Sequence, residues 1–257
     1  MRIKYWADCQ SHTKSMRKLV LGDIHGNYRA LQQCLERAKF DFISDQLIQL
    51  GDVADGYDDV YRCVELLLKV EKLIPIRGNH DLWFAEFIKT GVHPCNWEQS
   101  GTFTAYSYLK AAGRAEPYHV SDLTPEDIPE THRNFFLNQR FYHIDEQNNC
   151  FVHAGFDRTI PFEDQSPETY CWDRSLWKQA LASHASNKRN QSENQFKMVT
   201  QFREVFIGHT PTINWKTDKP MRAANIYNID TGCGHGYRLT IMDVSTKEYW
   251  QSDLQTS

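Results

Sequence analysis

Short apolar runs alternate with helical patterns along the first third of the chain. The runs KLVLG at residues 18–22, QLIQL at 46–50 and KLIPI at 72–76 have the length and character of buried strands. Between them, residues 27–39 and 58–70 carry apolar side chains three or four positions apart, which predicts two amphipathic helices. This alternation predicts a parallel sheet with helices packed on its faces.

The pattern changes between residues 82 and 149, where aromatic residues are frequent and the apolar spacing is helical. We therefore predict a mostly helical cap over residues 82–149, inserted into one domain that spans residues 1–257. Strand character then returns in four runs: CFVH at 150–153, VFIG at 205–208, NIYNI at 225–229 and RLTIM at 238–242.

Three segments have no clear apolar pattern. Residues 1–17 are interpreted as a polar arm, residues 183–193 as an exposed loop or frayed helix end, and residues 251–257 as a disordered end.

The composition is typical of a soluble globular protein. Charged residues make up 24% of the 257 residues, the net charge is −4, and no cluster of Lys and Arg stands out. We therefore expect neither a nucleic-acid partner nor a membrane partner. The seven cysteines are odd in number and never spaced as CxxC, which favours the reducing cytoplasm over a disulfide framework. The polar start of the chain predicts no signal peptide.

Five short polar segments each follow an apolar run: GDIHG at 22–26, GDVAD at 51–55, RGNHD at 77–81, HAG at 153–155 and GHT at 208–210. In open α/β sheets, ligands collect beyond the carboxyl ends of the strands, so these segments can face one crevice. Asp, Asn and His without a thiolate favour Mn²⁺, Fe, Zn²⁺ or Mg²⁺. Two such ions about 3.5–4 Å apart can bind phosphoryl oxygens, which predicts phosphate ester hydrolysis.

In this order and spacing, and together with WDR at 172–174 and IDTG at 229–232, the motifs resemble the phosphoprotein phosphatase family of the calcineurin-like metallophosphoesterases. Within that family they are most similar to the short bacterial and phage serine/threonine phosphatases. The resemblance runs from Lys18 to Val244. It implies an α/β (α+β) fold, a β-sandwich of two mixed sheets flanked by helices.

The resemblance also implies a reaction. A hydroxide that bridges two divalent metal ions would attack the phosphorus of a phosphate monoester directly, without a phosphoenzyme. Mn²⁺ is the first expectation for the metal, and phosphoserine or phosphothreonine in a protein is the first expectation for the substrate.

Residue by residue, the resemblance implies six metal ligands, of which Asp52 is shared by both ions. They are Asp23, His25, Asp52, Asn79, His153 and His209. It further implies that His80 is a general acid oriented by Asp55, and that Arg77 and Arg174 hold phosphate oxygens.

The second motif departs from the family pattern GDxxDRG. Gly56 stands where the family has arginine, so one expected phosphate contact is missing. Arg174 and Arg77 would then carry more of the phosphate binding, or Arg158 would help. The third motif ends in Asp81 where eukaryotic enzymes have Glu, a bacterial-type feature that keeps the charge.

Other interpretations of single residues stay open. Asp55 also suits a cap for the following helix, and Arg77 also suits a structural ion pair. His235 lies in the glycine-rich run GCGHG at 232–236, which we interpret as a turn rather than a pocket wall. The aromatic residues of the cap suit a substrate platform, although a hydrophobic core is the simpler interpretation.

Two other functions fit the same motifs. One is hydrolysis of dinucleoside polyphosphates or another small phosphorylated metabolite, and the other is a binding scaffold without catalysis. The complete set of six ligands favours an enzyme. The sequence leaves the native metal, the substrate and the oligomeric state open.

Overall fold

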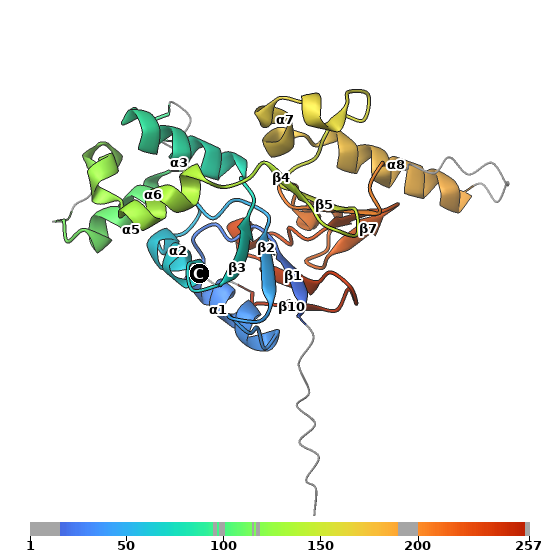
Figure 1. Ribbon diagram of the computed structural model, residues 1–257, viewed down its shortest axis with the longest axis horizontal. Helices are drawn as coiled ribbons and strands as arrows, with labels where there is room; N and C mark the ends of the chain where they lie inside the picture. The colour runs from blue at the N-terminus through green and yellow to red at the C-terminus, as the bar shows by residue number, and fades with distance from the viewer. Residues whose placement is uncertain are drawn as a thin grey trace, which may run out of the picture.

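Two five-stranded mixed sheets form the centre of the computed structural model, which describes residues 16–94, 97, 101–114, 116, 119–189 and 200–254 (Figure 1). The first sheet has the order β10-β9-β1-β2-β3. Its strands are β1 (Lys18–Leu21), β2 (Gln46–Gln49), β3 (Lys72–Pro75), β9 (Thr240–Asp243) and β10 (Tyr249–Gln251). The second sheet has the order β4-β5-β6-β8-β7. Its strands are β4 (Tyr142–Ile144), β5 (Asn149–Val152), β6 (Glu204–Ile207), β7 (Met221–Ala223) and β8 (Ile226–Asn228).

Alternating side chains place the two sheets face to face. In β1, Val20 joins the core between the sheets, whereas its neighbours Leu19 and Leu21 face the helices. In β6, Phe206 points to the same inter-sheet core, where its ring stacks on that of Phe151 with centroids 5.0 Å apart. Because side chains alternate between the two faces and both faces are buried, the strand is a continuous apolar run.

Helices cover both outer faces. On the first side are α1 (Tyr28–Arg37), α2 (Val60–Leu67), α3 (Asn79–Thr90), α5 (Thr102–Ala111) and α6 (Glu130–Leu137). On the other side are α7 (Pro167–Trp172) and α8 (Ser175–Arg189), at the right of Figure 1. Short 3-10 helices complete the described structure: η1 (Val120–Asp122), η2 (Pro125–Asp127), η3 (Phe162–Asp164), η4 (Thr212–Trp215) and η5 (Cys233–His235).

Local side-chain bonds explain where several elements begin. Asn27 caps α1, because its Oδ1 accepts a hydrogen bond of 3.0 Å from the Ala30 N–H. Asp45, just before β2, accepts hydrogen bonds from the backbone and guanidinium of Arg17, just before β1. Arg17 also donates to the carbonyl of Ala38 at the end of α1. One ion pair therefore joins the ends of three elements.

The sandwich of two mixed sheets flanked by helices is confirmed, and so is the parallel ladder β1-β2-β3. Residues 82–149 contain α5, α6 and most of α3, but they also contain β4 and the first residue of β5. Of the two alternatives for residues 183–193, a helix end fits residues 183–189, which close α8, and an exposed loop does not. The predicted disordered end is wrong for Gln251, which lies in β10, and for Ser252, which is buried.

Some expectations concern residues that lie outside the described part of the chain. These are residues 1–15 of the predicted arm, residues 190–193 of the predicted loop or helix end, and residues 255–257 of the predicted disordered end. Cys9 and Cys95 also lie outside it. The other five cysteines are buried and free of disulfides. No helix in the described part of the chain has the length and apolar character needed to cross a membrane.

Candidate metal centre

The predicted site residues lie at the carboxyl ends of five strands, where the two sheets meet. Asp23 and His25 follow β1, and Asp52 follows β2. Asn79 and His80 form the first turn of α3 after β3, while His153 and His209 follow β5 and β6. A pocket of about 340 Å³ opens over these ends and is lined by five of the six predicted ligands, with the fully buried His153 behind them.

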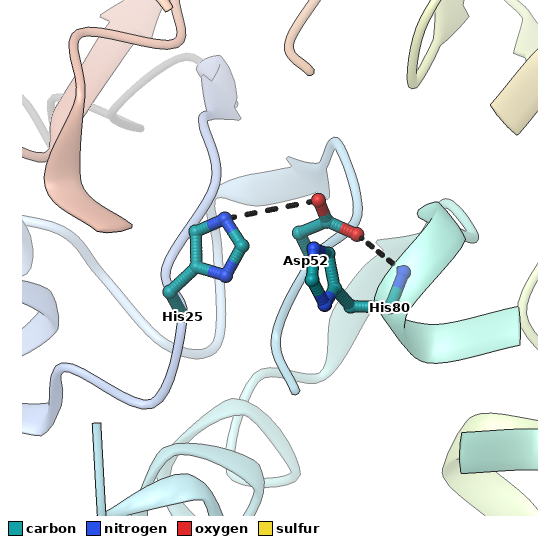
Figure 2. Close-up of side chains that lie close together, drawn as sticks. All are labelled: His25, Asp52 and His80. Carbon is teal, nitrogen blue, oxygen red and sulfur yellow. Dashed lines mark hydrogen bonds and ion pairs between the residues drawn. The ribbon is translucent and has the colours of Figure 1, made fainter. Parts of the chain in front are cut away.

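Asp52 lies at the centre of two clusters of possible ligand atoms. One contains His25 and His80, the other His153 and His209, and the atoms of each lie within 4.8 Å of one another. Asp52 Oδ2 is 3.7 Å from His25 Nε2 and 3.3 Å from His153 Nε2. Figure 2 shows Asp52 beside His25 and His80, with its second oxygen accepting a hydrogen bond of 3.0 Å from the His80 backbone N–H.

Two buried ligand atoms have no hydrogen-bond partner among the described residues, Asp23 Oδ1 and His209 Nε2. Burial lowers the pKa of His25 to about 4 and lowers that of His209 still further. Both imidazoles are therefore neutral at pH 7 and carry a free lone pair. Buried lone pairs of this kind are costly alone and fit divalent cations.

The buried carboxylates of the site also need a positive charge nearby. Burial raises the pKa of Asp23 well above its usual value, and the nearby charges of Asp230 and Asp52 add to the effect. Burial likewise raises the pKa of Asp230 to about 6. Burial acts on Asp52 in the same direction, but the surrounding histidines outweigh it and hold the pKa of Asp52 well below its usual value. Buried carboxylates this close need a cation, and two divalent ions fit the site.

A second layer of bonds holds the ligands. The Nδ1–H of His153 donates to the Leu50 carbonyl over 2.7 Å, so Nε2 is the nitrogen that faces Asp52 and Asn79 Oδ1. Asp81, fully buried, accepts hydrogen bonds from the backbone N–H groups of Val53 and Ala54. It thereby ties the loop that carries Asp52 to the first turn of α3, a role that its sequence position did not indicate.

The backbone around the site is strained. His25, Asp52, Asp55 and His209 have positive φ angles of 51°, 54°, 67° and 64°, a region that residues other than glycine rarely adopt. Gly78 packs so closely on Asp52 that an added Cβ would lie 2.1 Å from Asp52 Oδ1. Strain that recurs at one place is typical of functional sites.

Asp55 pairs with His80, as the motif predicts, and does not cap a helix. His80 Nδ1 lies 2.6 Å from Asp55 Oδ2. Burial acts to lower the pKa of His80, but the charges of Asp52 and Asp55 outweigh it and raise this pKa to about 9. The two carboxylates therefore favour the protonated form of His80.

The two predicted phosphate arginines have different surroundings. Arg174 lines the pocket, and its Nη1 donates to the His209 carbonyl and to Thr210 Oγ1, both over 3.1 Å. Arg77 is buried, and its Nη2 donates to the carbonyls of Phe136 and Leu137 in α6 over 2.7 and 2.9 Å. The phosphate role predicted for Arg77 does not fit this placement, because its guanidinium serves the packing of α6.

Arg158 does not reach the pocket either. It is exposed and donates to Gln179 Oε1 of α8 over 2.9 Å. Among the described residues, Arg174 is thus the arginine of the pocket wall.

The rim of the pocket contains residues that the motifs did not indicate. Phe103 at the start of α5 is 46% exposed and lines the pocket, whereas Phe84, Phe87 and Tyr108 of the cap are buried in the core. Trp83 is only partly buried. His235 also lines the pocket, so the loop 232–236 is more than the turn that we expected. Asp230, which belongs to the IDTG segment just after β8, completes the wall, although its sequence position indicated no role of its own.

Comparison with known proteins now places the chain. The sequence profile described as calcineurin-like phosphoesterase matches residues 16–235. The chain belongs to this family.

Calcineurin-like phosphoesterases of different named activities are similar to it. A symmetrical bis(5'-nucleosyl)-tetraphosphatase of Coxiella burnetii is 24% identical, with 92% of each chain covered. Serine/threonine-protein phosphatase 1 of Salmonella typhimurium is 28% identical and covers 86% of this chain and 89% of its own. Among solved structures, a protein proposed to be a diadenosine tetraphosphatase has a TM-score of 0.62 at 17% identity, over 95% of this chain and 96% of its own, and so shares the fold.

The backbone conformation at Gly56 explains why this calcineurin-like phosphoesterase lacks the arginine of the family motif. Gly56 has a φ of +85°, and a Cβ added there would lie 2.7 Å from His25 Cβ and 2.9 Å from the His25 carbonyl oxygen. An arginine cannot occupy this turn without moving His25, so Gly56 contributes backbone alone to the pocket wall.

Proposed function

We propose that this metallophosphoesterase hydrolyses dinucleoside polyphosphates, with a symmetrical dinucleoside tetraphosphate as the first substrate to test. The observation that carries the proposal is similarity over 92% of both chains to proteins named for that activity. The pocket of about 340 Å³ is in the size range of small-molecule sites. A dinucleoside polyphosphate thus replaces the phosphorylated protein that the motifs suggested as the first substrate. The proposed compartment is the cytoplasm.

The metal ligands are proposed as the motifs assign them. Asp23 and His25 would hold one ion, Asn79, His153 and His209 the other, and Asp52 both. When bound, two divalent ions, with Mn²⁺ the first expectation, supply positive charge to phosphoryl oxygens and lower the pKa of water. The chain's own contribution is the fixed orientation of the six side chains by bonds such as that from His153 Nδ1–H to Leu50.

Arg174 and His80 act on the substrate in this proposal. Arg174 is held by its Nη1, and no other nitrogen of its guanidinium is bonded within the described residues, so these nitrogens can donate to phosphate oxygens. His80 Nδ1 pairs with Asp55, and the other ring nitrogen of His80 can give a proton to the leaving oxygen, which contributes more the more basic that oxygen is.

Phe103 supports a nucleotide substrate. An aromatic ring that is 46% exposed on the wall of a phosphate pocket offers a surface on which a nucleobase can stack. His235 and Pro211 line the same pocket and bound the space that a nucleoside would fill.

A phosphorylated protein is the second candidate, and the pair formed by His80 and Asp55 favours it. The alkoxide that leaves a phosphoserine needs a proton, whereas a nucleoside diphosphate leaves as a stable anion and needs little acid catalysis. The Salmonella relative is named for this activity.

A substrate comparison tests the proposal. Purified protein with Mn²⁺ would be assayed on diadenosine tetraphosphate, a phosphoserine peptide and p-nitrophenyl phosphate, with products separated by chromatography. We expect the highest kcat/KM on diadenosine tetraphosphate, with two molecules of ADP as product. A higher kcat/KM on the peptide would establish the second candidate, and inactivity on all three would overturn the enzymatic function.

A further inference from the structure

Asp55 is held by a segment that lies outside every motif. Its Oδ2 pairs with His80, and its Oδ1 accepts two other hydrogen bonds, from Thr104 Oγ1 over 2.7 Å and from Trp97 Nε1 over 3.1 Å. The side chains of Thr104 and Trp97 are fully buried, so water does not compete for these bonds. Both residues are more than 40 positions away from Asp55 in the chain.

Thr104 bonds to Asp55 in two directions. Its Oγ1 accepts a hydrogen bond of 2.8 Å from the Asp55 backbone N–H while its own proton goes to Asp55 Oδ1. Because Asp55 has the strained φ of 67°, its backbone needs such an anchor. One hydroxyl group thus fixes both the backbone and the carboxylate of Asp55.

This arrangement determines how His80 is presented. With Oδ1 occupied by two donors, the carboxylate of Asp55 cannot rotate freely, and Oδ2 stays directed at His80 Nδ1. The ring nitrogen left for the substrate is then Nε2. In a buried network of this kind, each bond helps to fix the geometry of the next.

We propose that Thr104 and Trp97 are positioning residues for proton transfer by His80, acting through Asp55. The inference rests on the proposed function, in which His80 is the general acid. In that step the bond between phosphorus and the leaving oxygen breaks and the oxygen of a water forms the new bond to phosphorus. The proton of His80 Nε2–H goes to the leaving oxygen, and the proton lost by the water goes to the solvent.

The alternative is that the same bonds only stabilise the packing of α5. A structural role predicts that their loss lowers activity on every substrate by the same factor. A positioning role predicts a loss that grows as the leaving group becomes more basic, because only poor leaving groups need the proton. The dependence of kcat on the leaving group therefore distinguishes a positioning role from a structural role.

The experiment compares phenyl phosphate with p-nitrophenyl phosphate, whose leaving group is much less basic. Thr104→Val removes the hydroxyl at similar shape, and Thr104→Ser keeps it. Trp97→Phe removes the indole N–H together with part of the buried ring. We expect Thr104→Val to lower kcat on phenyl phosphate about tenfold or more, part of the 10²–10⁴ that general acids contribute, with a much smaller loss on p-nitrophenyl phosphate. Thr104→Ser should keep the wild-type ratio of kcat on the two esters. Trp97→Phe should lower kcat selectively on phenyl phosphate, as Thr104→Val does, but by a smaller factor.

His80→Asn separates failure of the inference from failure of the proposed function. If His80→Asn loses activity equally on both esters, His80 is not the acid and the proposed function fails in that part. If His80→Asn shows the selective loss but Thr104→Val and Trp97→Phe do not, the inference alone is overturned. Metal content and melting temperature would be measured for each variant. If Thr104→Val does not fold, Trp97→Phe decides, because the same two outcomes apply to it.

Discussion

At the scale of single residues, an arginine's role depends on what its guanidinium already contacts. Arg174, Arg77 and Arg158 are equivalent in charge, yet only Arg174 lines the pocket. Arg77 donates to two carbonyls of α6, and Arg158 donates to Gln179 on the surface.

Replacing these three arginines by glutamine should separate their roles. We expect Arg174→Gln to lower kcat/KM roughly 10–100-fold, the equivalent of one charge-assisted hydrogen bond of about 1.5–3 kcal/mol. Arg77→Gln should instead lower the free energy of unfolding by about 1–3 kcal/mol, because the buried carbonyl of Phe136 and the partly buried carbonyl of Leu137 lose a charged donor. Arg158→Gln is the matched surface control and should leave both quantities unchanged. Steady-state kinetics and urea unfolding measure them, and a larger kinetic loss for Arg77→Gln than for Arg174→Gln would contradict this assignment.

Gly56 is the residue at which the family pattern cannot be restored. Gly56→Arg would recreate the family motif, but its Cβ would meet His25 at 2.7 Å in a backbone conformation that disfavours side chains. We expect the variant to lose at least about 1–2 kcal/mol of stability, the cost of the left-handed conformation alone, and to lose activity because His25 moves. Gly56→Ala serves as control, since it should show the same loss without the arginine. An increase in kcat/KM for Gly56→Arg would refute this explanation.

At the scale of elements, the pair formed by Arg17 and Asp45 joins the start of β1, the end of α1 and the start of β2. Burial acts to raise the pKa of Asp45, but hydrogen bonds from Arg17 and from the Asp41 N–H outweigh it and hold this pKa below its usual value. The folded state therefore favours the ionised carboxylate more than the unfolded state does.

Asp45→Asn should destabilise the protein by about 1–3 kcal/mol at pH 7, since it leaves the guanidinium of Arg17 without its counter-charge. The stabilisation by Asp45 is fully present above the unfolded pKa of about 3.9 and is lost as the pH falls through the lower folded pKa. Urea unfolding of both proteins should thus give a gap that is constant near neutral pH and closes in acid. A gap that persists at the lowest pH would mean that the charge of Asp45 contributes little.

At the scale of the whole molecule, the site joins the two halves of the chain, because Asp23 and Asp52 follow strands of the first sheet and His153 and His209 follow strands of the second. Ions bound at such a site stabilise the folded state by mass action. The gain is about 2.7 kcal/mol for each site when the free metal concentration is 100 times the Kd.

Removal of metal with a chelator should therefore lower the melting temperature, and added Mn²⁺ should restore it. Asp23→Asn should weaken the response, since it removes a charge from the site, whereas Arg158→Gln should leave it intact. Calorimetry and metal analysis by mass spectrometry give readouts that do not depend on activity. Identical melting curves with and without Mn²⁺, and no metal bound, would contradict the proposed ligand set.

Much of this molecule could be predicted from its sequence because the relevant signals are local. Short continuous apolar runs such as KLVLG place the strands, and polar residues at strand ends meet because parallel strands share an edge. The three-residue strands β4, β7 and β10 escaped prediction because neighbouring strands, not their own pattern, hold them. The contacts of Arg77 with α6 and of Asp55 with Thr104 escaped for a related reason, since they join residues 59 and 49 positions apart.

The separation of Asp23 from His209 has a consequence for biosynthesis. The two residues are 186 positions apart, yet Asp23 Oδ2 accepts a hydrogen bond from the His209 backbone N–H. At about 5–20 residues per second, the ribosome needs roughly 10–40 seconds to pass from one to the other. During that interval the nascent chain holds the carboxylate of Asp23 without His209, and for most of it also without His153. The complete set of ligands first exists only once His209 has been made.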